Sequence, residues 1–160
     1  MSVTTIALTL ALAGTPKQWT VTADPLTELL GFVHVQVERV VSDRHSLYLG
    51  PSLKLFNSPL GVGTGPFNGY GLETGVRGFI TGTAPEGMWI MLRAVLAAVT
   101  HAGGVEPGGY GSALVGYTAI FGPGFVLSGG LGISYFAYGP KDVGIHGFLP
   151  AAHTALGWAF

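Results

Sequence analysis

Apolar and polar side chains alternate with a period of two along most of the chain. In Phe32–Val41 the odd positions are mostly valines, whereas the even positions include His34, Gln36 and Glu38. A β-strand sends successive side chains to opposite faces, so this pattern predicts a strand with one apolar and one polar face. The same reading predicts seven strands, at Phe32–Val41, Ser46–Phe56, Tyr70–Thr81, Met88–His101, Gly111–Phe121, Phe125–Tyr138 and Gly147–Phe160.

An eighth strand is predicted at Trp19–Leu30, with Pro25 at a bulge or a poorly paired stretch inside it. Two longer glycine-rich connections are expected at Pro59–Gly69 and Ala102–Gly109. Shorter turn signals separate the other strands, at Ser42–Arg44, Asn57–Pro59, Pro85–Gly87, Gly122–Gly124 and Gly139–Asp142. Eight is the smallest usual strand number for a membrane barrel, whose short turns alternate with longer loops.

Composition argues against helices in a chain that is nevertheless apolar. Only 9% of the 160 residues are charged, against roughly 25% in an ordinary soluble domain, and the mean hydropathy is +0.50. The longest uncharged stretch, Pro107–Pro140, contains ten glycines and an internal proline, which break a membrane-spanning helix. Closed barrels are the other architecture that satisfies the backbone in a bilayer. The sequence therefore predicts an all-β fold, an eight-stranded antiparallel transmembrane β-barrel of outer-membrane type.

The polar faces of the predicted strands converge on the barrel interior. Eight strands leave an interior just wide enough for side chains to fill it, and charges buried there need partners. We therefore predict a lumen closed by a polar network, with a narrow pore or small-ligand channel as the alternative. The predicted network consists of His34, Gln36, Glu38, Lys54, Glu73, Arg77 and Arg93. His101 and His153 share this face, and Asp24 and Glu28 are further candidates.

Both ends of the chain carry candidate targeting signals. Residues 1–13 are short, apolar and end in Ala11-Leu12-Ala13, which predicts a secretory signal peptide, although no Lys or Arg precedes the apolar stretch. Cleavage there leaves residues 14–160 as a single barrel domain; a further strand is the alternative. Leu156, Trp158 and Phe160 resemble the terminal signal by which bacterial assembly machinery recognises outer-membrane barrels.

Several short motifs recur in order along the chain. They are Trp19-Thr20-Val21-Thr22 with Pro25-Leu26, Val35–Asp43, Ser46-Leu47, and Gly109-Tyr110-Gly111 with Gly116-Tyr117. This order resembles a bacterial outer-membrane family catalogued as domain of unknown function 3575. The resemblance extends loosely over residues 18–160, and the last strand departs from the family at Pro150 and His153. It implies a small eight-stranded barrel in the outer membrane of a Gram-negative bacterium and supplies no activity.

Catalytic and cofactor chemistry finds little support in the sequence. No histidine has a nucleophile two positions after it on the same strand face, so a triad would have to be assembled across strands. The chain has no cysteine and no HxH or HExxH pattern, so we expect no metal or other cofactor. A net charge of −1 gives no basic footprint for nucleic acid.

We therefore expect a non-catalytic outer-membrane barrel that acts structurally or through its loops. The expected partners are outer-membrane lipids and, during insertion, the barrel-assembly machinery, with a monomeric barrel as the final state. Alternatives are a lipid-modifying outer-membrane enzyme and a soluble lipocalin-like barrel with its faces inverted. The inverted barrel would place Glu38, Lys54, Glu73 and Arg77 on an outer surface otherwise poor in charge.

Overall fold

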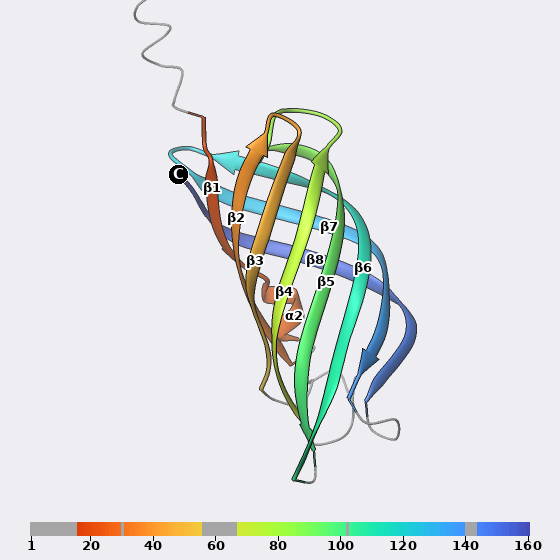
Figure 1. Ribbon diagram of the computed structural model, residues 1–160. Coiled ribbons are helices and arrows are strands. Elements are labelled where there is room, and N and C mark those ends of the chain that lie inside the picture. The colour runs from red at the N-terminus through yellow and green to blue at the C-terminus, as the bar shows by residue number, and fades with distance from the viewer. Residues whose placement is uncertain (1–15, 30, 56–66, 102, 140–143) are drawn as a thin grey trace, which may run out of the picture.

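The computed structural model describes residues 16–29, 31–55, 67–101, 103–139 and 144–160. Each strand pairs antiparallel with its neighbours in the sequence, and the last strand pairs with the first, so the sheet closes on itself (Figure 1). The predicted all-β, eight-stranded antiparallel barrel is thus confirmed. Its strands are β1 (Trp19–Ala23), β2 (Phe32–Ser42), β3 (His45–Lys54), β4 (Asn68–Phe79), β5 (Gly87–His101), β6 (Gly104–Phe121), β7 (Phe125–Tyr138) and β8 (Ile145–Ala159).

A single short helix, α2 (Pro25–Glu28), accompanies the strands in the described part of the chain. Across the described residues, no helix has the length and apolar character needed to cross a membrane.

Alternation along each strand separates the two faces of the barrel wall. Large apolar side chains lie on the outer face, including Leu96 (76% exposed), Phe148 (71%) and Leu131 (68%). The interior holds charged residues, serines and threonines, together with two apolar clusters. This is the reverse of a soluble protein, in which apolar residues are the ones most often buried.

Two groups of rings and aliphatic side chains fill separate parts of the interior. One contains Phe32, Tyr110 and Tyr138, and the other contains Tyr48 and Trp89. Each group also contacts a polar residue: His34 lies against Phe32 and Tyr110, while the Arg77 guanidinium lies over Tyr48 and Trp89. Aromatic and polar side chains therefore pack together in both parts of the interior.

The predicted strand at Trp19–Leu30 is wrong in its second half. The chain leaves β1 after Ala23, and Asp24 caps α2 by accepting hydrogen bonds from the backbone nitrogens of Leu26 (3.2 Å) and Thr27 (3.3 Å). Pro25 occupies the first helical position, where its fixed φ and missing N–H are tolerated. Proline therefore begins a helix here and does not interrupt a strand.

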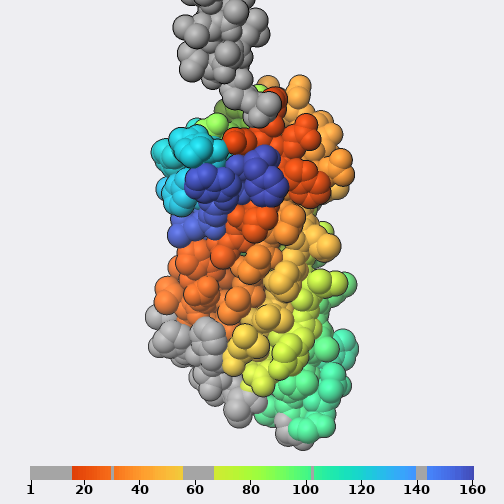
Figure 2. Space-filling model, turned by 90° about the vertical axis from the view of Figure 1, so that its left-hand side faces the viewer, coloured from red at the N-terminus to blue at the C-terminus, as the bar shows by residue number. Residues whose placement is uncertain are grey.

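This early end of β1 leaves the barrel wall incomplete on one side. β1 pairs with β8 only from Thr20 to Ala23, opposite Leu156–Ala159. Beyond Ala23, no strand among the described residues lies between the first half of β8 and the start of β2, and α2 packs against both. Figure 2 faces this side, where the N-terminal part of the chain (red and orange) lies beside the end of β8 (blue).

The glycine-rich connection expected at Ala102–Gly109 is also wrong. β5 and β6 stay paired as far as His101 and Gly104, which leaves two residues for the turn. Gly103 has a φ of +80°, a conformation that tight hairpin turns require. Pairing with the long β5 thus extends the sheet through residues whose local preferences favour a loop.

Other sequence predictions fall outside the described residues. They are the signal peptide at residues 1–13, the turn at Asn57–Pro59, most of the Pro59–Gly69 connection, and residues 140–142 of the last turn.

Candidate functional site

All seven residues of the predicted polar network are buried in the barrel interior. Three lie at alternate positions of β2, one at the end of β3, and three on β4 and β5. Their shared face follows from strand alternation, since neighbouring strands point paired residues to the same side. By element they are His34, Gln36 and Glu38 on β2, Lys54 on β3, Glu73 and Arg77 on β4, and Arg93 on β5.

Glu38 and Arg77 form the central ion pair. Arg77 Nη1 donates to Glu38 Oε2 at 2.8 Å, and both side chains are almost fully buried. Glu38 also accepts hydrogen bonds from the hydroxyls of Thr20 (3.1 Å) and Ser46. A buried carboxylate with this many donors is satisfied, which is the condition under which a buried ion pair is tolerated.

A histidine relay connects Arg77 to the start of the helix. Arg77 Nη2 lies 2.9 Å from His153 Nε2, and His153 Nδ1 lies 2.9 Å from Asp24 Oδ2. A guanidinium can only donate, so His153 Nε2 accepts and its Nδ1–H donates to Asp24. Asp24 also accepts from the Thr154 hydroxyl at 2.7 Å, so one carboxylate caps α2 and ties β8 to it.

Glu73 is the centre of a second group of polar residues. Its two oxygens accept from His34 Nδ1 and Gln36 Nε2. On the other side of the ring, His34 Nε2 lies 3.1 Å from Ser52 Oγ and 3.4 Å from the Tyr110 hydroxyl. β2, β3, β4 and β6 supply these residues, and the register places His34 directly opposite Ser52.

Glu73, His34 and Ser52 thus follow the order of the carboxylate–histidine–serine arrangement of hydrolases. The spacing of residues along one strand cannot predict this arrangement, because its three residues come from three strands. Predicting it requires the register between neighbouring strands. Ser52 is fully buried, however, and does not line the interior cavity beside this group. The hydroxyl acts here as a hydrogen-bond partner of a packed ring.

Arg93 differs from the other interior cations in its surroundings. Its Nε donates to Ser112 Oγ at 3.3 Å, and its guanidinium lies 5.3 Å from the centre of the Tyr110 ring. Its Nη1 is buried and has no hydrogen-bond partner within the described part of the chain. Lys54, by contrast, lies over the Phe67 ring at 4.2 Å and within 3.5 Å of the Phe67 carbonyl.

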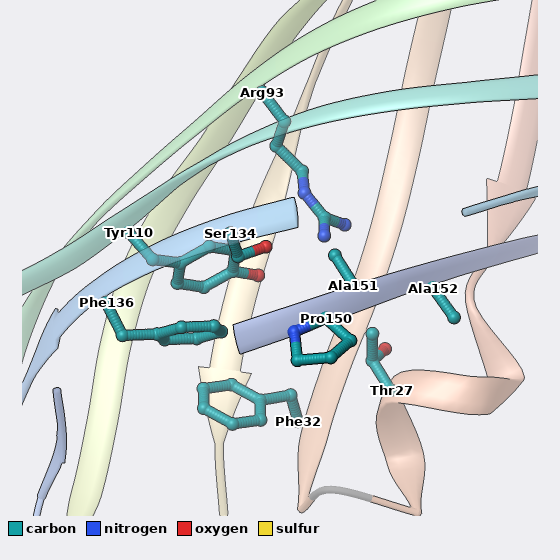
Figure 3. A pocket seen from close by; sticks show the side chains of 9 residues that line it. All are labelled: Thr27, Phe32, Arg93, Tyr110, Ser134, Phe136, Pro150, Ala151 and Ala152. Carbon is teal, nitrogen blue, oxygen red and sulfur yellow. The ribbon is translucent and has the colours of Figure 1, made fainter. Parts of the chain in front are cut away.

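A cavity of about 60 Å³ adjoins Arg93. Figure 3 shows the guanidinium reaching into it from β5, toward Ala151 on β8, with Tyr110 and Ser134 to one side. The remaining lining is largely apolar. It consists of Thr27, Phe32, Phe136, Pro150 and Ala152.

The interior charges balance. Among the described residues, three carboxylates, those of Asp24, Glu38 and Glu73, are buried with the three cations Lys54, Arg77 and Arg93. Of the two uncertain acidic candidates, Asp24 joins the network and Glu28 is exposed. Among the histidines, His153 is buried and His101 is half-buried. In the described ranges, no three His, Cys, Asp or Glu side chains gather as a metal site.

The C-terminal residues lie at the seam where the barrel closes. Leu156, Trp158 and Phe160 are exposed on the outer face. The Phe160 carbonyl accepts hydrogen bonds from the backbone nitrogens of Gln18 and Trp19, each at 3.0 Å. The last residues therefore stabilise the contact between β8 and β1 as well as presenting aromatic side chains outward.

The fold and interior together define a class: a closed eight-stranded antiparallel β-barrel with a buried polar network and an apolar outer face. Protein-family models, curated proteins and solved structures yield no match to this chain.

Proposed function

We propose that this chain is an integral β-barrel of the bacterial outer membrane that acts structurally or through its loops, with a side-chain-filled lumen and no catalysis. The observation that carries this proposal is the inverted distribution of polarity. Large apolar side chains cover the outer face of all eight strands, while six charged side chains of the described residues are buried inside. Transmembrane barrels need this arrangement, because their outer face contacts hydrocarbon.

The alternative of a soluble barrel would expose this apolar surface to water. Soluble monomers rarely expose a contiguous apolar patch larger than a few hundred Å². Here the exposed apolar residues recur along every strand from β1 to β8. The surrounding lipid is therefore the partner that best fits this surface.

The resemblance to domain of unknown function 3575 agrees with this assignment of fold and location, and we carry it only as part of the proposal. We also propose that Leu156, Trp158 and Phe160 act as the signal read by the barrel-assembly machinery. Their exposure on the outer face leaves these side chains accessible to such a partner. The lumen assignment rests on the Glu38–Arg77 pair and its neighbours, and no cofactor is part of the proposal.

The test uses the three tryptophans, which the structure places differently. Trp19 and Trp158 are exposed on the outer face, whereas Trp89 is fully buried. Variants that keep one tryptophan each are folded into vesicles whose lipids carry bromine on their acyl chains. We expect strong fluorescence quenching for Trp19 and Trp158 and weak quenching for Trp89. Equal quenching of all three, or a protein that stays soluble without detergent, would contradict the proposal.

A further inference from the structure

The part of β8 without a β1 partner and the Arg93 guanidinium lie next to the same cavity. Thr27 of α2, Phe32 of β2 and Pro150 to Ala152 of β8 line it from the side where β1 is missing. Arg93 lines it from the opposite wall, on β5. The lining therefore runs from a buried guanidinium to Pro150, which is exposed on the barrel surface.

Arg93 is only 6% exposed, and it has no carboxylate within 4.0 Å among the described residues. Its Nη1 also has no hydrogen-bond partner there. Buried polar groups are normally hydrogen-bonded, and buried charges are normally paired. Arg77 meets both conditions in the same barrel, so the surroundings of Arg93 are a local property of this cavity.

We propose that this cavity binds the carboxylate of a fatty acid, with the carboxylate on Arg93 and the hydrocarbon chain leaving past Pro150, on the part of β8 that has no β1 partner. A guanidinium presents paired N–H donors that match the two oxygens of a carboxylate. The Ser134 hydroxyl lies beside it as a further donor. Phe32, Phe136 and Pro150 give the first carbons of the chain an apolar path.

The size of the cavity sets how the ligand lies. A cavity of about 60 Å³ holds a carboxylate and its first carbons, so a longer chain has to extend out of it. Beyond Pro150, the outer face of β8 continues with Phe148, which is strongly exposed. Pro150 has no backbone N–H, which suits a strand edge without a neighbouring strand. Entry of the chain from lipid rests on the proposed membrane location, whereas binding at Arg93 does not.

The experiment measures octanoate binding to the folded barrel in detergent by isothermal titration, with empty micelles as the blank. Heat-modifiable gel migration reports the folded fraction of every variant separately. We expect saturable binding, weakened about ten- to a hundredfold in Arg93→Gln, the loss that follows when a hydrogen-bonded charge is removed. Arg39→Gln is the matched control, because Arg39 loses the same charge on the outer face and should bind octanoate like the wild type.

Ala151→Leu is a second variant that fills the cavity and keeps Arg93, and it should also abolish binding. Butyrate should bind at least about tenfold more weakly than octanoate, since it buries fewer methylene groups. Octanol should not bind measurably. The proposal is overturned if the folded wild type does not bind octanoate, if Arg93→Gln or Ala151→Leu binds like the wild type, or if octanol or butyrate binds as tightly as octanoate. A barrel that binds octanoate but fails the tryptophan test would retain the site and lose the membrane location.

Discussion

Glu38 and Arg77 show how single residues make a charged interior tolerable. The carboxylate accepts from Arg77, Thr20 and Ser46, so little of its hydrogen-bonding capacity is unused. The guanidinium in turn reaches His153 and lies over two aromatic rings. Each charge is therefore held by several neighbours, and removing one partner leaves the others buried without it.

Arg77→Gln should destabilise the folded barrel by about 3–5 kcal/mol, because it leaves Glu38 as an uncompensated buried charge. The measurement is urea-induced unfolding of the protein folded in lipid vesicles, followed by gel migration. Glu38→Gln combined with Arg77→Gln should be more stable than Arg77→Gln alone. Arg39→Gln on the outer face of β2 is the control and should cost less than about 1 kcal/mol. Equal losses for Arg77→Gln and Arg39→Gln would contradict the buried ion pair.

Ser52 is the residue at which the absence of catalysis can be tested. Its hydroxyl faces His34 in a hydrolase-like order, yet it is fully buried. We expect that a fluorophosphonate probe does not label the folded protein at Ser52. Ser52→Ala should lower stability by about 1 kcal/mol, the net contribution of one hydrogen bond. Labelling of Ser52, together with ester hydrolysis that Ser52→Ala abolishes, would establish an enzyme.

Strands pack against one another in the interior through pairs of large and small residues. The Trp89 indole on β5 lies over Gly116 on β6 and Gly130 on β7, which the register places opposite each other. Its Nε1 donates to Thr118 Oγ1 at 2.9 Å. Any side chain at either glycine would meet the indole, so the glycines make the space that the ring fills.

Gly130→Ala should therefore lower the free energy of unfolding by about 1–3 kcal/mol, the usual cost of overpacking a core. Gly129→Ala is a matched control one residue away, because its added carbon would lie 4.0 Å from the nearest atom, the His153 carbonyl oxygen. We expect the control to stay within about 0.5 kcal/mol of the wild type. Urea unfolding of both variants in the same vesicles compares them directly, and a larger loss for Gly129→Ala would refute the packing explanation.

At the level of elements, alternation was sufficient to predict β2, β3, β4, β5, β7 and β8 to within about two residues at each end. It failed after Ala23, since a four-residue helix is too short to show a helical period. It also failed at residues 104–109, where pairing with β5 overrides the local preference of glycine and proline. Alternation also identified which side chains face inward. Their partners depend on cross-strand register, as the Glu38–Arg77 pair across β3 shows.

For the whole molecule, the low charge fraction acquires a structural explanation. Six of the thirteen Asp, Glu, Lys and Arg residues in the described part of the chain are buried in the interior, where they pair or stack, and most of the outer wall is left to apolar side chains. The glycines allow large rings to fit in a narrow barrel or form its turns. The interior and the outer face of the barrel thus need different side chains from the same strands. Alternation with a period of two gives each face its own set.

A filled interior predicts the electrical behaviour of the barrel. Aromatic and charged residues around Arg77 and His34 fill the interior together with the two apolar clusters, and the cavity beside Arg93 is small. Eight-stranded barrels with such interiors have no open water path. We therefore expect no steady single-channel steps when the folded wild type is added to planar lipid bilayers at 1 M salt, about the concentration at which surface charges are fully screened. A known sixteen-stranded porin in the same bilayers is the positive control. Regular steps from the wild type, absent from a heat-unfolded sample of the same preparation, would show that the lumen conducts.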